Sequence, residues 1–161
     1  VRTWGPKGQT PVFKVIQKHD RISAISALAV SPQRKRIGLY FRLRKRNLTG
    51  LDVFAFLRHL LRHLRGHVVL IWDRGTIHRH WKVKELLAKT PRLHVEWLPP
   101  YAPELNPAEN VWAQADRKLS NSVPEDLDDL DCNLRFAVRH IRGSQNRLRA
   151  CIKSTDLPWR I

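Results

Sequence analysis

The sequence predicts an α/β fold in which a mixed sheet is flanked by helices. Segments rich in β-branched and aromatic residues alternate with segments whose apolar residues recur every three or four positions. Residues 67–72 form a continuous apolar run, which is typical of a strand buried on both faces. The chain has 161 residues, of which 42% are hydrophobic, so it is long enough to bury a core without disulfide bonds.

The first part of the predicted sheet is an antiparallel meander of three strands. Residues 12–17 (VFKVIQ), 22–30 and 36–42 are rich in β-branched and apolar residues, and short polar turns separate them. Residues 1–11 contain two glycines and two prolines, so we expect a loop before the meander.

Helices and strands alternate after the meander. A helix is predicted to begin after Thr49 as its N-cap and to end at Gly66, because apolar residues recur at helical spacing between them. The buried strand over residues 67–72 follows. Residues 79–90 are predicted to form a second helix, and residues 93–98 alternate between apolar and polar side chains as a strand does.

A proline-rich loop over residues 99–107 leads into a third helix. Asn106 is its predicted N-cap, and Pro107 takes the first helical position, where no N–H is needed. The remainder of the chain predicts one or two helices with an acidic start and a basic end, which suits the helix dipole. We therefore expect a core over residues 1–122 and a C-terminal helical segment over residues 123–161.

This order of elements is that of an RNase H-like core. Such a core opens on a strand that carries an acidic residue. Here the first acidic residue is Asp20, which falls in a predicted turn, and the next is Asp52, in the first turn of a predicted helix. We therefore predict an RNase H-like mixed sheet flanked by helices, with the first acidic strand missing. Since residue 1 is Val and Met is absent, we also expect a fragment or an unusual start codon.

Positive charge dominates the composition. The chain holds 30 Lys and Arg against 14 Asp and Glu, and residues 1–66 hold 15 basic and two acidic residues. Such a density of one sign attracts polyanions, and nucleic acid is the default partner. No apolar run approaches the ~18 residues of a membrane span. No secretory signal opens the chain, and the two cysteines match no zinc or redox spacing, so we expect a cytoplasmic location and no membrane partner.

Two acidic residues are candidates for chemistry. Asp73 follows the buried strand directly, where an open α/β sheet places its ligands. The alternative is that Asp73 only begins a turn with Arg74 and Gly75. Glu109 lies three residues after Asn106, where it could serve as a capping-box acid. The prolines before it stiffen the backbone, however, and a rigid backbone suits a metal ligand.

Three motifs in this chain resemble those of mariner-type transposases and their bacterial insertion-sequence relatives. The stretch LPPYAPELNPAENVW, Leu98 to Trp112, looks like their third-acid motif. The stretch VLIWDRGTIH, Val69 to His78, is similar to their second-acid motif, and RTWGPKGQTP is similar to the loop that follows their first acidic strand. The 35 residues between Asp73 and Glu109 are close to the short spacing typical of that group.

The resemblance implies a DDE or DDD triad that cleaves DNA and joins a 3′-hydroxyl to target DNA. It implies Asp73 and Glu109 as catalytic ligands of Mg²⁺ or Mn²⁺, with two ions in an intact site. It implies that the partner is double-stranded DNA, both the transposon ends and the target, and that the protein forms a homodimer. The first acid would precede the RTWGPKGQTP loop, which stands here at the start of the chain. We therefore predict little or no cleavage by this chain alone.

Basic clusters and histidines complete the predicted interface with DNA. Contact with the DNA backbone is the preferred interpretation of two clusters that flank the third predicted strand: Arg34, Lys35 and Arg36, and Arg42, Arg44, Lys45 and Arg46. The alternative is a charged strand edge that prevents aggregation. His78 resembles the histidine of the family motif and is expected to contact DNA or water at the metal, with packing as the alternative.

The spacing of His59, His63 and His67 would also allow a metal, but a solvated basic face is preferred. Two other functions stay open. A non-catalytic, basic nucleic-acid-binding remnant with an RNase H-like core would keep the fold without the chemistry. A ribosomal or structural RNA-binding protein would explain the charge but not the proline-rich motif.

Overall fold

The structure is a computed structural model, and it describes residues 21–157 apart from residues 121 and 123. The predicted strand over residues 12–17 and the loop before it lie outside the described residues. The helices and strands in chain order are β1 (Ser23–Val30), β2 (Ile37–Arg44), α1 (Gly50–His63), β3 (Val68–Trp72), α2 (Trp81–Ala88), β4 (Leu93–Trp97), α3 (Pro107–Leu119), α4 (Leu127–Arg142) and α5 (Gln145–Lys153), with short 3₁₀ turns η1 (Thr76–Arg79) and η2 (Pro103–Leu105).

The described strands form two separate pairs. β1 and β2 form an antiparallel hairpin whose register runs from Ser23 opposite Arg44 to Val30 opposite Ile37. β3 and β4 are parallel, with Trp72 opposite Trp97. Parallel and antiparallel pairing therefore both occur, as the predicted mixed sheet requires. Among the described residues, however, β1 pairs only with β2 and β3 only with β4, so the strands do not form one continuous sheet.

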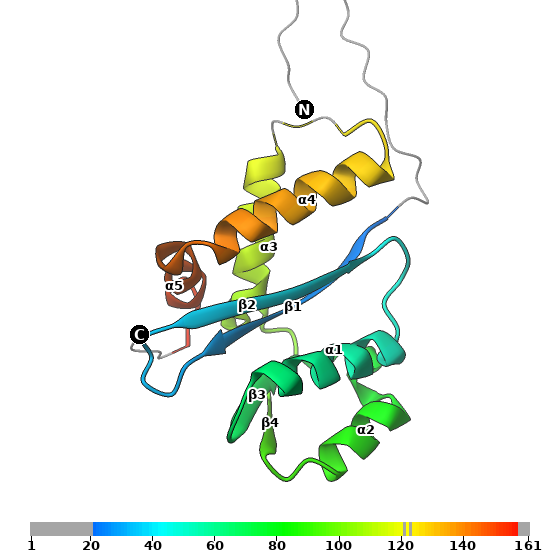
Figure 1. Cartoon of the computed structure of the whole chain (residues 1–161), viewed down its shortest axis with the longest axis vertical. Helices are drawn as coiled ribbons and strands as arrows, with labels where there is room; N and C mark the ends of the chain where they lie inside the picture. Colours follow the sequence, from blue (N-terminus) through cyan, green and yellow to red (C-terminus); the bar gives the residue numbers. More distant parts are fainter. Residues whose placement is uncertain (1–20, 121, 123, 158–161) are drawn as a thin grey trace, which may run out of the picture.

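Two hydrophobic clusters position the elements. Helices α3, α4 and α5 cover one face of the β1–β2 hairpin, as Figure 1 shows. The buried residues of this cluster are Ile37, Leu39, Val111, Ala115, Ala137, Val138, Ile141, Leu148, Cys151 and Ile152. The other face of the hairpin contributes Ile25 and Ala27 to a second cluster with α1, α2 and β3, built on Val53, Phe56, Leu57, Leu60, Trp72 and Val83. The hairpin is therefore covered by helices on both faces.

Most predicted helix boundaries are confirmed. Thr49 is the N-cap of α1, and Gly66 has a φ of 74°, a left-handed conformation that favours glycine, in the turn between α1 and β3. Asn106 caps α3, its side chain accepting from the Ala108 N–H at 3.1 Å, and Pro107 is the first helical residue. The helix predicted over residues 79–90 is shorter, because η1 comes first and the His80 side chain caps α2.

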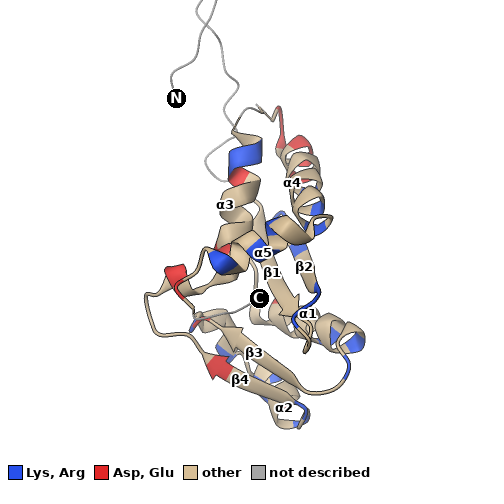
Figure 2. Ribbon diagram, turned by 90° about the vertical axis from the view of Figure 1, so that its left-hand side faces the viewer, with Lys and Arg blue, Asp and Glu red and all other residues tan. Residues whose placement is uncertain are grey.

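The C-terminal segment consists of two helices. Asp126 accepts a hydrogen bond from the Asp129 N–H at 2.8 Å and so caps α4. Figure 2 shows the acidic start of α4 and the basic residues toward its other end, as the sequence predicts. Leu148 and Ile152 of α5 lie in the same cluster as Ile37 of β2, so these helices contribute to one core with the hairpin. No helix among the described residues is both long and apolar enough to cross a membrane.

Candidate active site

Asp73 lies at the carboxyl end of β3. The strand is held in register to its last residue, since Leu98 donates its N–H to the Trp72 carbonyl at 2.9 Å just beyond β4. The Asp73 side chain is 56% exposed, and one of its oxygens, Oδ1, accepts the Gly75 N–H at 2.8 Å. A Cβ at Gly75 would lie only 3.0 Å from that oxygen, so a larger residue here would crowd the carboxylate. Asp73 thus both begins a turn and presents a carboxylate to solvent.

His78 holds the Asp73 carboxylate from the side. Its Nε2 lies 2.9 Å from Asp73 Oδ1, and its ring stacks on Trp72 with centroids 4.3 Å apart. Burial lowers the pKa of His78 below its ordinary value, although the nearby Asp73 charge acts in the opposite direction. A neutral ring that donates from Nε2 leaves Nδ1 as an acceptor, and Nδ1 is buried without a hydrogen-bond partner among the described residues. His78 therefore both packs against Trp72 and contacts the Asp73 carboxylate.

Glu109 lies in the first turn of α3 with an exposed side chain. Its own N–H donates to the Asn106 carbonyl at 3.1 Å. The Asn106 N–H, which a capping-box acid would bind, donates instead to the Pro103 carbonyl at 2.9 Å. Because η2 supplies that acceptor, the Glu109 carboxylate has no structural role among the described contacts.

Asp73 and Glu109 meet at one hollow, although 35 residues separate them in sequence. The hollow has a volume of about 540 Å³ and is lined on its other sides by the proline-rich loop and by Arg74 and Arg79. Arg74 is positioned by its Nε, which donates to the Leu98 carbonyl at 3.3 Å. Neither arginine was among the predicted site residues, yet both follow the buried strand within six residues of Asp73.

Asp73 and Glu109 are the two carboxylates at this hollow that could hold a hydrated divalent cation. Carboxylate oxygens are the ligands that Mg²⁺ and Mn²⁺ prefer, and Mg²⁺ commonly takes one or two carboxylates and keeps several waters. Within the described part of the chain, no group of three or more His, Cys, Asp or Glu side chains is placed to hold a metal ion. The two carboxylates therefore match part of a two-ion site and not the whole.

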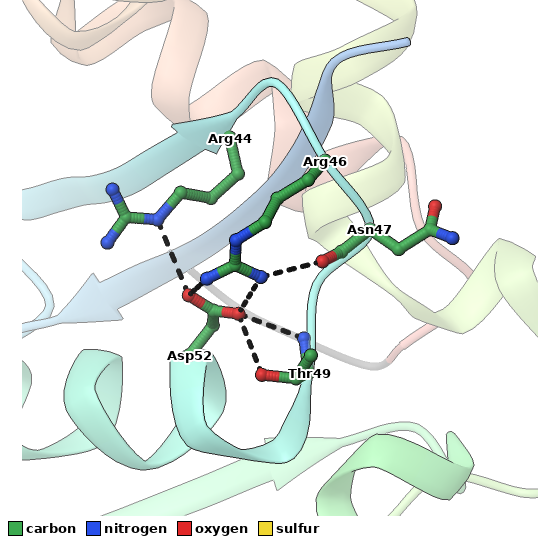
Figure 3. Close-up of polar contacts among 5 residues, drawn as sticks. All are labelled: Arg44, Arg46, Asn47, Thr49 and Asp52. Atoms are coloured by element: carbon green, nitrogen blue, oxygen red, sulfur yellow. Dashed lines mark hydrogen bonds and ion pairs between the residues drawn. The ribbon is translucent and has the colours of Figure 1, made fainter. Parts of the chain in front are cut away.

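Several of the predicted DNA contacts are engaged within the protein. Figure 3 shows Arg46 bound to both carboxylate oxygens of Asp52, at 2.8 and 2.9 Å, with Arg44 Nε 3.4 Å from Oδ1. Lys45 forms an ion pair with Asp128. The Asp52 carboxylate also accepts the N–H and hydroxyl of Thr49, at 3.0 and 2.9 Å. Arg44 and Arg46 thus help to fix the start of α1, whereas Lys45 connects the segment before α1 to the start of α4.

The Arg46 hydrogen bonds hold the pKa of Asp52 far below its usual range, with help from Thr49 and against the effect of burial. The remaining predicted contacts are Arg34, Lys35 and Arg36, exposed in the β1–β2 turn, and Arg42, half-buried on β2. The Lys35 carbonyl accepts a hydrogen bond from Arg149 at 3.0 Å, which ties this turn to α5.

The histidines of α1 form a basic, aromatic face. The rings of His59 and His63 lie 4.4 Å apart, and Tyr40 contacts both. Burial, followed by the nearby charges of His63 and Arg42, lowers the pKa of His59.

Comparisons with known proteins identify relatives of this chain. The family described as DDE superfamily endonuclease matches residues 1–131. A protein of Sinorhizobium fredii, called uncharacterized protein y4pE/y4sA, is 36% identical over 97 residues. That match covers 60% of this chain and spans 59% of the length of the relative.

Two solved structures are similar in fold. A Mos1 transposase catalytic domain with raltegravir and Mg has a TM-score of 0.52 at 16% identity, over 88% of this chain and 86% of that one. The catalytic domain of Mos1 mariner transposase has a TM-score of 0.52 at 17% identity, over 84% of this chain and 82% of that one.

Proposed function

This chain belongs to the DDE superfamily endonucleases and has their RNase H-like fold, and on that basis we propose that it is part of the catalytic core of a transposase. Its proposed substrate is double-stranded DNA, and its proposed chemistry is metal-dependent strand cleavage and joining. The observation that carries the proposal is that Asp73 and Glu109 line one hollow, together with two arginines.

Each side chain at the hollow has a proposed role. Asp73, oriented by His78 and the Gly75 N–H, and Glu109, fixed at the capped start of α3, would hold Mg²⁺ or Mn²⁺. A bound divalent ion stabilises negative charge on a phosphate and lowers the pKa of a bound water. Arg74 and Arg79 would bind the phosphate backbone, because a guanidinium matches two phosphate oxygens.

We also propose that the protein forms a homodimer. A measurement of its molecular mass in solution would check this.

The chain alone is expected to cleave DNA poorly. The family triad needs a third acid, and Asp52 cannot supply it because its carboxylate is bound by Arg44, Arg46 and Thr49. With Mn²⁺ and supercoiled plasmid, the 161-residue chain should nick no faster than its Asp73→Asn variant. Rapid nicking that Asp73→Asn abolishes would contradict an incomplete site. Equal duplex DNA binding by both proteins without nicking would favour the alternative of a non-catalytic DNA-binding remnant.

DNA binding should depend on Lys35 and Arg42, which form no ion pair with an acidic side chain within the described residues. Each phosphate contact contributes about 0.9 to the slope of log affinity against log salt concentration. Replacing both Lys35 and Arg42 with glutamine should therefore reduce that slope by about 2, measured by fluorescence anisotropy with duplex DNA. Lys89→Gln is the matched control, because Lys89 is paired with Glu85 at 2.6 Å. An unchanged slope in the double variant would place the DNA on another surface.

A further inference from the structure

The Tyr101 side chain is fully exposed to solvent in the proline-rich loop. The other exposed large apolar side chains of the described residues are at most 64% exposed, because each of them packs partly against its neighbours. The tyrosine ring adds no apolar burial to the fold and forms no hydrogen bond or ring contact with another described residue. One exposed aromatic side chain is ordinary at a protein surface, but the backbone and the position of Tyr101 set it apart.

The backbone holds Tyr101 in a conformation that favours glycine. Its φ is 58°, and Arg34 is the other non-glycine residue with a positive φ among the described residues. The left-handed region costs free energy for any residue with a Cβ, and Pro100 restricts the same turn. Glycine would suit this backbone and would lose no packing, so the stability of the fold does not explain a tyrosine here.

Hydrogen bonds hold both ends of the loop beside the proposed active site. At its start, Arg74 Nε donates to the Leu98 carbonyl at 3.3 Å. At its end, the Pro103 carbonyl accepts the Asn106 N–H at 2.9 Å. Residues 99–103 include three prolines, each of which fixes its own φ. The loop therefore presents the tyrosine ring from a restricted backbone.

Tyr101 lines the same hollow as Asp73 and Glu109. Arg74 and Arg79 line it as well, and their guanidinium groups already suit phosphate oxygens. The uncharged ring adds what the arginines and the carboxylates lack, which is a flat apolar face. In DNA the flat apolar faces belong to the bases, and bases stack on aromatic side chains.

We propose that Tyr101 stacks on an unpaired DNA base next to the phosphate that lies at Asp73 and Glu109. Paired bases inside a duplex are stacked on each other, so an unpaired or displaced base is the one that can offer its face to a side chain. The preferred substrate is therefore DNA with unpaired bases beside the hollow. This inference rests on the proposed function, because it needs DNA at the hollow, and it adds the form of DNA that is bound.

Binding of the full 161-residue chain to two DNA probes tests the proposal. Each probe is a duplex interrupted by a short internal loop, whose nucleotides carry unpaired bases in one probe and are abasic in the other. The two probes therefore have the same number of phosphates. Fluorescence anisotropy in the presence of Mn²⁺ should show at least about fivefold tighter binding to the probe with bases. Tyr101→Phe should keep this preference, because it retains the ring, and Tyr101→Leu should remove it.

Trp81→Leu is the matched control. Trp81 is 63% exposed on α2 and does not line the hollow, so this variant should keep the preference of the original chain. Urea unfolding should give the same midpoint for Tyr101→Leu as for the original chain, because the exposed ring packs against no described residue. A lost preference in Tyr101→Leu then reports the lost contact with DNA and not a loss of folding.

Three outcomes would overturn the proposal while DNA binding persists. The first is equal binding of both probes by the original chain. The second is a preference that Tyr101→Leu leaves unchanged, because another surface would then contact the bases. The third is a preference that Tyr101→Phe also loses, because the tyrosine hydroxyl and not the ring would then make the contact. Loss of binding to both probes would overturn the proposed function and this inference with it, so the two failures are distinguishable.

Discussion

Replacing Asp52 with asparagine is expected to lower the free energy of unfolding by about 2 kcal/mol. The Asp52 side chain is 5% exposed and receives hydrogen bonds from Arg46 and Thr49, so it loses its charge and part of its bonding where water cannot compensate. This loss of unfolding free energy is smaller than that expected on breaking a fully buried ion pair, because the Arg46 side chain is 56% exposed. Urea unfolding of the two proteins measures the difference.

Asp128→Asn is the matched control. It removes the partner of Lys45 from an ion pair in which the Asp128 side chain is 87% exposed, and should cost no more than about 0.5 kcal/mol. An Asp52→Asn protein as stable as Asp128→Asn would show that the Asp52 cluster does not fix the start of α1.

The Asp52 effect should depend on pH with a definite sign. The folded protein lowers the pKa of Asp52, chiefly through Arg46, so the stabilisation is present above the unfolded value of about 3.9. It is lost as the pH falls through that value toward the lower pKa of the folded state. The stability difference between the original chain and Asp52→Asn should therefore be constant from about pH 5 to 7 and shrink below about pH 4. A difference that grows on acidification would contradict the ion-pair account.

Replacing Asp73 with asparagine is expected to weaken Mn²⁺ binding by at least about tenfold, because the variant loses a charged oxygen ligand at a site with two carboxylates. Glu109→Gln should act similarly. Both side chains are exposed, so neither change should alter the thermal midpoint by more than a few degrees. Glu104→Gln is the control. Glu104 is an exposed carboxylate in the proline-rich loop before α3, and its side chain does not line the hollow. Equal weakening by Glu104→Gln would indicate non-specific attraction of the ion.

Local signals predicted the parts of the fold that depend on local physics. Thr49, Gly66, Asn106 and Pro107 mark helix ends through backbone geometry and hydrogen bonds within a few residues, and the structure places them as expected. The start of α2 was missed because the signal there is a histidine cap after a 3₁₀ turn, and His80 is not a usual N-cap residue.

Contacts between distant segments could not be derived in the same way. Arg44 and Arg46 reach Asp52 only because the end of β2 lies beside the first turn of α1. The sequence does not show that arrangement, so the two arginines resembled a free basic cluster. Asp73 and Glu109 were identified through their motifs, but nothing in these motifs indicated that Arg74 and Arg79 would line the same hollow. The separation of the strands into two pairs depends on what lies between β1 and β3, which strand propensity does not report.

A Mn²⁺ titration of four proteins tests the central claim most directly. The proteins are the original chain, Asp73→Asn, Glu109→Gln and the double variant, and the measured quantity is the dissociation constant. If Asp73 and Glu109 hold the same ion, the second substitution should weaken binding far less in the presence of the first than it does alone. Independent, additive losses would mean that the two carboxylates bind separately, and the proposed active site would be wrong.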